Sequence, residues 1–135
     1  MTIIVAYAPR PEGRAAVEKG IEIAASSGEK LIVVNAGVGG NTNDVSVAKA
    51  QDAEEVEELL AASGLDAEFK QYIRGHTSLE EIQQLVRDYA ASLVIIGLRK
   101  RSKVGKLLLG SMAQNILLSV PCPVLAVKAL DESWL

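Results

Sequence analysis

Apolar runs rich in valine and isoleucine alternate with amphipathic segments along nearly the whole chain of 135 residues. Runs such as "TIIVAYA" (2–8) and "KLIVVNA" (30–36) lack regular polar alternation, which is typical of strands buried on both faces of a sheet. The segments between the runs carry apolar residues at helical spacing. Because parallel strands need helical crossovers to join them, this alternation predicts an α/β fold.

The pattern also predicts the bounds of each element. We expect strands at 2–8, 30–36, 67–73, 92–97 and 123–129, helices at 11–27, 44–63, 78–91 and 111–120, and a loop at 37–44. This order predicts a three-layer sandwich, in which a five-stranded, mainly parallel sheet has helices on both faces. No linker or internal repeat divides the chain, so residues 1–135 are expected to form one domain. Ligands of such sheets bind beyond the carboxyl ends of the strands.

Charge and composition exclude several classes of protein. A net charge of −3 argues against a nucleic-acid partner, which favours a broadly basic surface. No apolar run reaches the roughly 20 residues that span a bilayer, and no secretion signal begins the chain, so we expect a cytoplasmic protein without a membrane span. The single cysteine, Cys122, permits no internal disulfide and is expected to be a small buried side chain. With His76 as the only histidine, no metal site is expected.

A cluster of cations lies in the segment "GLRKRSKVGKLLLGS" (97–111), between an apolar strand and a helix that is expected to begin at Ser111. The cations are Arg99, Lys100, Arg101, Lys103 and Lys106. A strand-to-helix loop of this composition suits an anion, because helix amides, a serine hydroxyl and the helix dipole all favour negative charge. Two simpler interpretations stay open: the cations form a solvated basic loop, and Ser111 only caps its helix.

The sequence lacks the motifs of two common enzyme classes, the Walker A loop and the nucleophile elbow. The Walker A pattern is absent, because Lys100 stands five residues before Gly105 and Leu107 follows Lys106. The chain has no G-x-S-x-G elbow and no histidine placed to serve a serine. An enzyme is therefore not expected from the residues alone.

The order of elements, the strand "LVIIG", the segment "GKLLLGS" and the ending "AQNILLSVPCPVLAVK" resemble the universal stress protein family over nearly the whole chain. The nucleotide motif of that family is a glycine, two residues, a glycine, nine residues, and a glycine followed by serine or threonine. Gly97, Gly110 and Ser111 match this spacing, but Lys100 replaces the middle glycine. Ala8 replaces the aspartate that the family usually has after the first strand. The resemblance implies an adenine nucleotide alpha hydrolase-like fold with a degenerate ATP-binding motif.

The resemblance also implies where a ligand lies, across the carboxyl ends of the first, second and fourth strands. Residues that would border the base are Ala6, Tyr7, Ala8 and Ala36, and those that would border the ribose and phosphates are Ile96, Gly97, Lys100, Gly110, Ser111 and Met112. The expected ligand is ATP, with Mg²⁺ if ATP binds, or another phosphorylated small molecule. Lys100 either binds a phosphate directly or occupies the place of the triphosphate. The methyl group of Ala8 accepts no hydrogen bond, so poor discrimination among bases is expected.

Two functions from different classes follow from the resemblance. The first is a small binding and signalling module of the stress response. The alternative is an interaction protein that binds no nucleotide and forms a homodimer. Family members commonly pair the last strand across a twofold axis, which here is Pro123 to Ala129. Slow ATP hydrolysis, as in some family members, is a third expectation.

Overall fold

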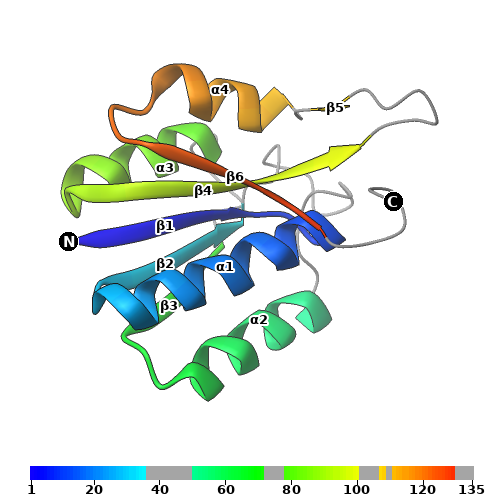
Figure 1. Cartoon of the computed structure of the whole chain (residues 1–135), viewed down its shortest axis with the longest axis vertical. Coiled ribbons are helices and arrows are strands. Elements are labelled where there is room, and N and C mark those ends of the chain that lie inside the picture. The colour runs from blue at the N-terminus through cyan, green and yellow to red at the C-terminus, as the bar shows by residue number, and fades with distance from the viewer. Residues whose placement is uncertain (36–49, 72–77, 101–106, 109–110, 130–135) are drawn as a thin grey trace.

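A parallel sheet lies at the centre of the structure, with α1 and α2 on one face and α3 and α4 on the other (Figure 1). The computed structural model describes residues 1–35, 50–71, 78–100, 107–108 and 111–129. The elements in chain order are β1 (Thr2–Tyr7), α1 (Pro11–Ser27), β2 (Lys30–Asn35), α2 (Ala50–Ser63), β3 (Ala67–Lys70), α3 (Ser78–Asp88), β4 (Ala91–Lys100), β5 (Leu107–Leu108), α4 (Ser111–Ser119) and β6 (Val124–Lys128).

Five strands pair in parallel in the order β3-β2-β1-β4-β6, and the short β5 pairs antiparallel with the end of β4. The predicted three-layer architecture, with a mainly parallel sheet and helices on both faces, is therefore confirmed. No helix among the described residues is both long enough and apolar enough to cross a membrane.

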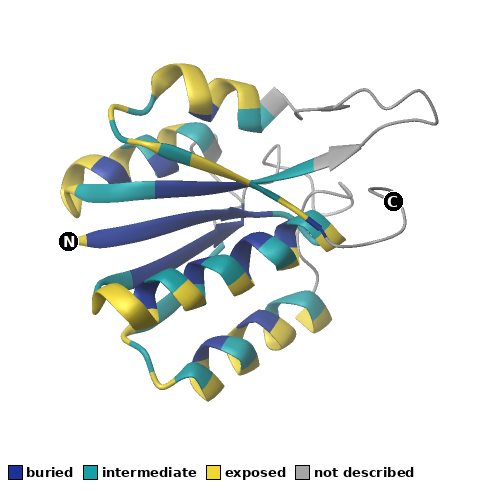
Figure 2. Ribbon diagram, viewed as in Figure 1, coloured by how far each residue is buried: buried dark blue, intermediate teal, exposed yellow. Residues whose placement is uncertain are grey.

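The residues of β1 are all buried and alternate between two hydrophobic clusters (Figure 2). Ile3, Val5 and Tyr7 pack against α1 and α2, whereas Ile4 and Ala6 pack with residues of α3 and α4. Successive side chains of a strand point to opposite faces of a sheet, so a run without polar residues supplies both layers of the core. This division decides which predicted site residues can share one cavity.

The predicted bounds of α1 are confirmed at both ends. Pro11 occupies the first helical turn, where its missing N–H costs nothing. Gly28 ends the helix in the left-handed conformation, with φ at 76°, and its N–H donates to the Ala24 carbonyl over 2.8 Å. Because α1 follows the carboxyl end of β1 and packs on it, the helix runs from the carboxyl edge of the sheet back along β1.

Other boundaries differ from the prediction. Helix α3 ends at Asp88 rather than at 91, because Ala90 adopts a left-handed φ of 49° and Ala91 already pairs with Thr2 in the sheet. Strand β3 ends at Lys70. The predicted loop at 37–44, the first residues of the helix expected from 44, and residues 72–73 lie outside the described residues.

The segment predicted as one loop from Gly97 to Ser111 is partly strand. β4 continues to Lys100, and Leu107–Leu108 return antiparallel beside it, with Lys100 opposite Leu107 and Arg99 opposite Leu108. The neighbouring strand β6 pairs with β4 only as far as Leu98. The returning segment thus supplies backbone partners to the end of a strand that would otherwise present unpaired groups.

Candidate functional site at the carboxyl edge of the sheet

The sheet opens between β1 and β4 at its carboxyl edge. The pairing of these strands ends at Val5 and Ile95, although both strands continue further. Beyond that point, among the residues that the structure describes, β1 pairs only with β2, as far as Tyr7 and Asn35. The chain leaves β1 toward α1 on one face and leaves β4 toward α4 on the other. Such a switch in crossover direction is where open α/β sheets bind ligands.

Three of the predicted site residues come together on the α3/α4 side of this opening. Ala6 of β1 and Ile96 of β4 are buried in one cluster, and the half-buried Met112 of α4 packs against it. Residues far apart in sequence therefore form one apolar wall. That this wall borders a ligand, as the resemblance implies, stays a prediction. Apolar side chains of this kind can contact the face of a planar ligand but contribute no hydrogen bonds.

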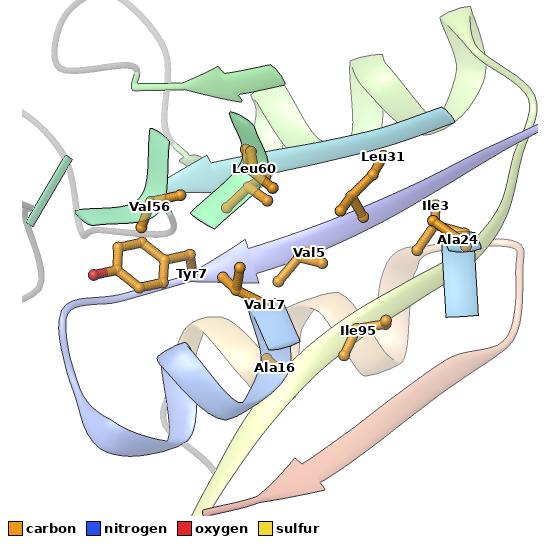
Figure 3. Packing of buried hydrophobic residues seen from close by; sticks show 11 residues of the cluster. Ile3, Val5, Tyr7, Ala16, Val17, Ala24, Leu31, Val56, Leu60 and Ile95 are labelled. Carbon is orange, nitrogen blue, oxygen red and sulfur yellow. The ribbon is translucent and has the colours of Figure 1, made fainter. Parts of the chain in front are cut away.

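The side chain of Tyr7 lies on the opposite face of the sheet. Its ring packs edge-to-face against Phe69 of β3, with the ring centroids 6.0 Å apart and the planes at 82°. Figure 3 shows the ring beside Val56 of α2, with the hydroxyl group directed away from the cluster. Tyr7 and Ala6 therefore contribute side chains to different spaces, although both were predicted to border one base.

The pKa of Tyr7 is raised to about 12, mainly by burial and also by the nearby carboxylates of Asp52 and Glu55, against the opposing effect of Arg14. The hydroxyl group is consequently a neutral hydrogen-bond donor at any physiological pH. It lies at the end of β1 and faces α2 rather than the opening between β1 and β4.

Gly97 has a packing role in addition to its place in the predicted motif. A Cβ atom at this position would lie 2.7 Å from the carbonyl oxygen of Glu12 in the first turn of α1. Gly13 is equally constrained, because a Cβ there would lie within contact of the Ala8 carbonyl oxygen. The two glycines allow α1 to begin directly against the ends of β1 and β4.

The remaining predicted residues are placed only in part. Lys100 is the last residue of β4 and its backbone pairs with β5, so it does not form the open loop that a phosphate-binding glycine would provide. Ser111 is the first residue of α4. The side chains of both, and all of Ala36 and Gly110, lie outside what the structure describes. Ala8 follows β1 and is half-buried.

Two amide side chains at the same edge were not predicted. Asn35, which is 2% exposed, donates from Nδ2 to the Tyr7 carbonyl over 3.1 Å, and its Oδ1 accepts from Gln71 Nε2 over 3.2 Å. This link fixes the ends of β1, β2 and the segment after β3 relative to one another. A polar residue that ends an otherwise apolar strand was the available signal.

Within the described ranges, no three histidine, cysteine, aspartate or glutamate side chains lie close enough together to hold a metal ion. Cys122 is half-buried beside the α3/α4 cluster, and burial raises the pKa of its thiol. The described residues at this edge of the sheet therefore supply an apolar wall, the start of α4 and two linked amide side chains.

The comparisons with known proteins agree on one family. The profile of the universal stress protein family matches residues 1–128. A universal stress protein of Mycolicibacterium smegmatis is 44% identical over 126 residues, covering 93% of this chain and 96% of the relative.

Solved structures extend the likeness to the fold. A universal stress protein of Archaeoglobus fulgidus superposes with a TM-score of 0.71 at 26% identity, over 94% of this chain and 97% of the other. A structure of the Archaeoglobus fulgidus protein in complex with dAMP gives 0.67 at 19% identity, over 94% and 96% of the two chains. A universal stress protein in complex with cAMP gives 0.67 at 22% identity, over 96% and 97%.

Proposed function

Because the chain belongs to the universal stress protein family, we propose that it is a small binding module for a nucleotide or a related phosphorylated molecule. The observation that carries this proposal is the separation of β1 from β4 beyond Val5 and Ile95. The opening has an apolar wall of Ala6, Ile96 and Met112 on one side. Such a wall suits the base or sugar of a nucleotide, and the start of α4 suits a phosphate.

The structural relatives in complex with dAMP and cAMP support a nucleotide as the ligand. Both of those ligands carry one phosphate. ATP with Mg²⁺ is one specific ligand within this proposal, and its binding requires Lys100 to accommodate a triphosphate. Slow hydrolysis of ATP is a further activity that requires ATP to bind, and the release of inorganic phosphate over time tests it.

Gentle denaturation of freshly purified protein, followed by mass analysis of the released small molecules, is the direct test. We expect a nucleotide near one per chain, or else a thermal shift when dAMP, cAMP or ATP with Mg²⁺ is added. The variant Ser111→Ala should weaken binding about tenfold, because a hydroxyl donor to a charged group is lost. Ser119→Ala, at the other end of the same helix, is the matched control and should bind normally. Absence of both a released nucleotide and any thermal shift would contradict the proposal.

A second candidate, a homodimeric interaction protein, is favoured by one observation on β6. Within the described residues this strand pairs only with β4, and Leu125 is 36% exposed. The Pro123 carbonyl accepts from Val94 N–H, so in this parallel ladder the backbone groups of Ala126 point to the outer edge. A second copy that pairs antiparallel along this edge would cover it.

The variant Ala126→Pro tests the homodimer, because it removes an outward N–H donor while sparing the ladder with β4. We expect the mass measured by light scattering to fall from that of a dimer to that of a monomer. Ala126→Thr retains the N–H and should stay dimeric. A monomeric wild type, or a dimeric proline variant that remains folded, would argue against dimerisation through this edge.

A further inference from the structure

A pocket of about 390 Å³ lies between α1 and α2, on the face of the sheet that Tyr7 occupies. Its floor is apolar, formed by Val17 of α1 and by Val56 and Leu59 of α2. Ligand pockets in proteins measure about 300–1,000 Å³ and combine an apolar lining with a few convergent polar groups. The wall formed by Ala6, Ile96 and Met112 lies on the other face of the sheet, so this pocket is separate from that wall.

One wall of the pocket carries the cation of Arg10. Arg10 is half-buried, and within the described residues its guanidinium makes no hydrogen bond or ion pair. Its neighbour Arg14 differs, because its Nε lies 3.2 Å from Glu18 Oε1 and its Nη1 lies 3.9 Å from Glu55 Oε2. A partly desolvated guanidinium without a protein partner favours an anionic group on whatever occupies the pocket.

The other wall is acidic. Asp52 and Glu55 of α2 line the pocket, and both carboxylates act on the buried hydroxyl of Tyr7. These two carboxylates repel a ligand that is purely anionic, and Glu55 also lies 3.9 Å from Arg14 Nη1. An ammonium group on the ligand would remove that repulsion and gain hydrogen bonds to carboxylate oxygens.

We propose that the pocket between α1 and α2 binds a small zwitterion with an apolar body, of the chemical class of the apolar α-amino acids. The carboxylate of the ligand pairs with Arg10. The ammonium group lies toward Asp52 and Glu55. The apolar body covers the floor of Val17, Val56 and Leu59. This site is independent of the proposed nucleotide site.

Calorimetric titration with three matched probes tests the proposal on the full chain: L-leucine, 4-methylpentanoate, which lacks the amine, and 3-methylbutylamine, which lacks the carboxylate. We expect leucine to bind at least about tenfold more tightly than either analogue, because each analogue lacks one of the two charges that the walls of the pocket attract. Equal binding of leucine and one analogue would overturn the zwitterion, and absence of leucine binding up to about 10 mM would overturn the site.

Two variants locate the binding. Arg10→Gln should weaken leucine binding about tenfold or more and leave 3-methylbutylamine unaffected. Arg87→Gln on α3, whose guanidinium lies 3.2 Å from Gln84 Oε1 and does not line the pocket, is the matched control and should bind leucine normally. Arg10→Gln should also keep any binding of dAMP, whereas displacement of leucine by dAMP would show that the pocket belongs to the nucleotide site and overturn the proposal.

Discussion

The α-carbon of Gly97 in β4 lies against the carbonyl group of Glu12 in α1, so that a Cβ at residue 97 would stand 2.7 Å from that oxygen and 2.8 Å from its carbon. Both obstructing atoms belong to the backbone of the helix and cannot rotate away. The contact joins the first turn of α1 to the strand that borders the proposed nucleotide site.

We therefore expect Gly97→Ala to lower the free energy of unfolding by about 1–3 kcal/mol, since the added methyl group forces α1 away from β4. Urea unfolding followed by circular dichroism measures the change. Gly64→Ala is the control, because its new methyl group meets no atom within 4 Å and only the left-handed φ of 70° opposes it, at a cost of about 1 kcal/mol. A loss at residue 97 smaller than that at residue 64 would mean that α1 adapts easily.

Much of the fold was predictable because its signals are local. The uninterrupted apolar runs indicated β1 and β2, and Pro11 with Gly28 bounded α1 correctly. Local sequence patterns did not predict strand residues whose pairing partners lie elsewhere in the chain. Arg99 and Lys100 read as loop residues, yet they extend β4 because residues 107–108 return beside them. Polar composition predicts exposure, but it does not reveal a partner strand.

The candidate site was predictable only in part. Ala6, Ile96 and Met112 share one apolar cluster, whereas the side chain of Tyr7 faces α2. That these residues border a ligand stays a prediction. Gly97 was interpreted as a ligand glycine, and no local signal shows that it also packs against Glu12. The pocket between α1 and α2 depends on how two helices pack, which the pattern of apolar residues does not specify.

Ala90 lies in the turn after α3, in a conformation that an alanine rarely adopts, with φ at 49°. Ala90→Gly should therefore raise the free energy of unfolding by about 0.5–1 kcal/mol, because glycine enters the left-handed region without steric cost. Ala25→Gly, an exposed helical position of α1, should instead lower it by up to about 1 kcal/mol. Thermal unfolding of both variants distinguishes the two effects, and a destabilised Ala90→Gly would show that the turn carries no strain.

Tyr7 should make the stability of the protein sensitive to alkaline pH. The pKa of its hydroxyl rises to about 12 in the folded state through burial and the carboxylates of Asp52 and Glu55, against about 10 in an unfolded chain. Unfolded chains therefore ionise first, so the contribution of the neutral hydroxyl is complete below pH 10 and is lost as the pH rises toward 12.

Tyr7→Phe should consequently lose less stability than the wild type between about pH 9 and 11, by up to about 2 kcal/mol in unfolding free energy. Tyr89→Phe is the matched control at a tyrosine that is 37% exposed, and it should follow the wild type. Denaturant unfolding at each pH measures the difference. Parallel pH profiles for wild type and Tyr7→Phe would show that the Tyr7 hydroxyl is freely solvated.

Asn35 joins the ends of three strands through its side-chain amide, which donates one hydrogen bond and accepts another. Mutation can remove the two bonds together or the donated one alone. Asn35→Leu should lower the free energy of unfolding by about 2–3 kcal/mol, because the buried Tyr7 carbonyl and the Gln71 amide each lose a hydrogen bond. Asn35→Asp keeps the acceptor toward Gln71. Its ionised carboxylate cannot donate to the Tyr7 carbonyl, but the protonated acid can.

The aspartate variant should therefore be destabilised more at pH 8 than at pH 4, each compared with the wild type at the same pH. Asn115→Asp, an exposed position of α4, is the matched control and should show little dependence of this kind. Urea unfolding at the two pH values decides the matter. If Asn35→Asp were as stable as the wild type at pH 8, the bond from Asn35 Nδ2 to the Tyr7 carbonyl would contribute nothing to holding the carboxyl ends of β1 and β2 together.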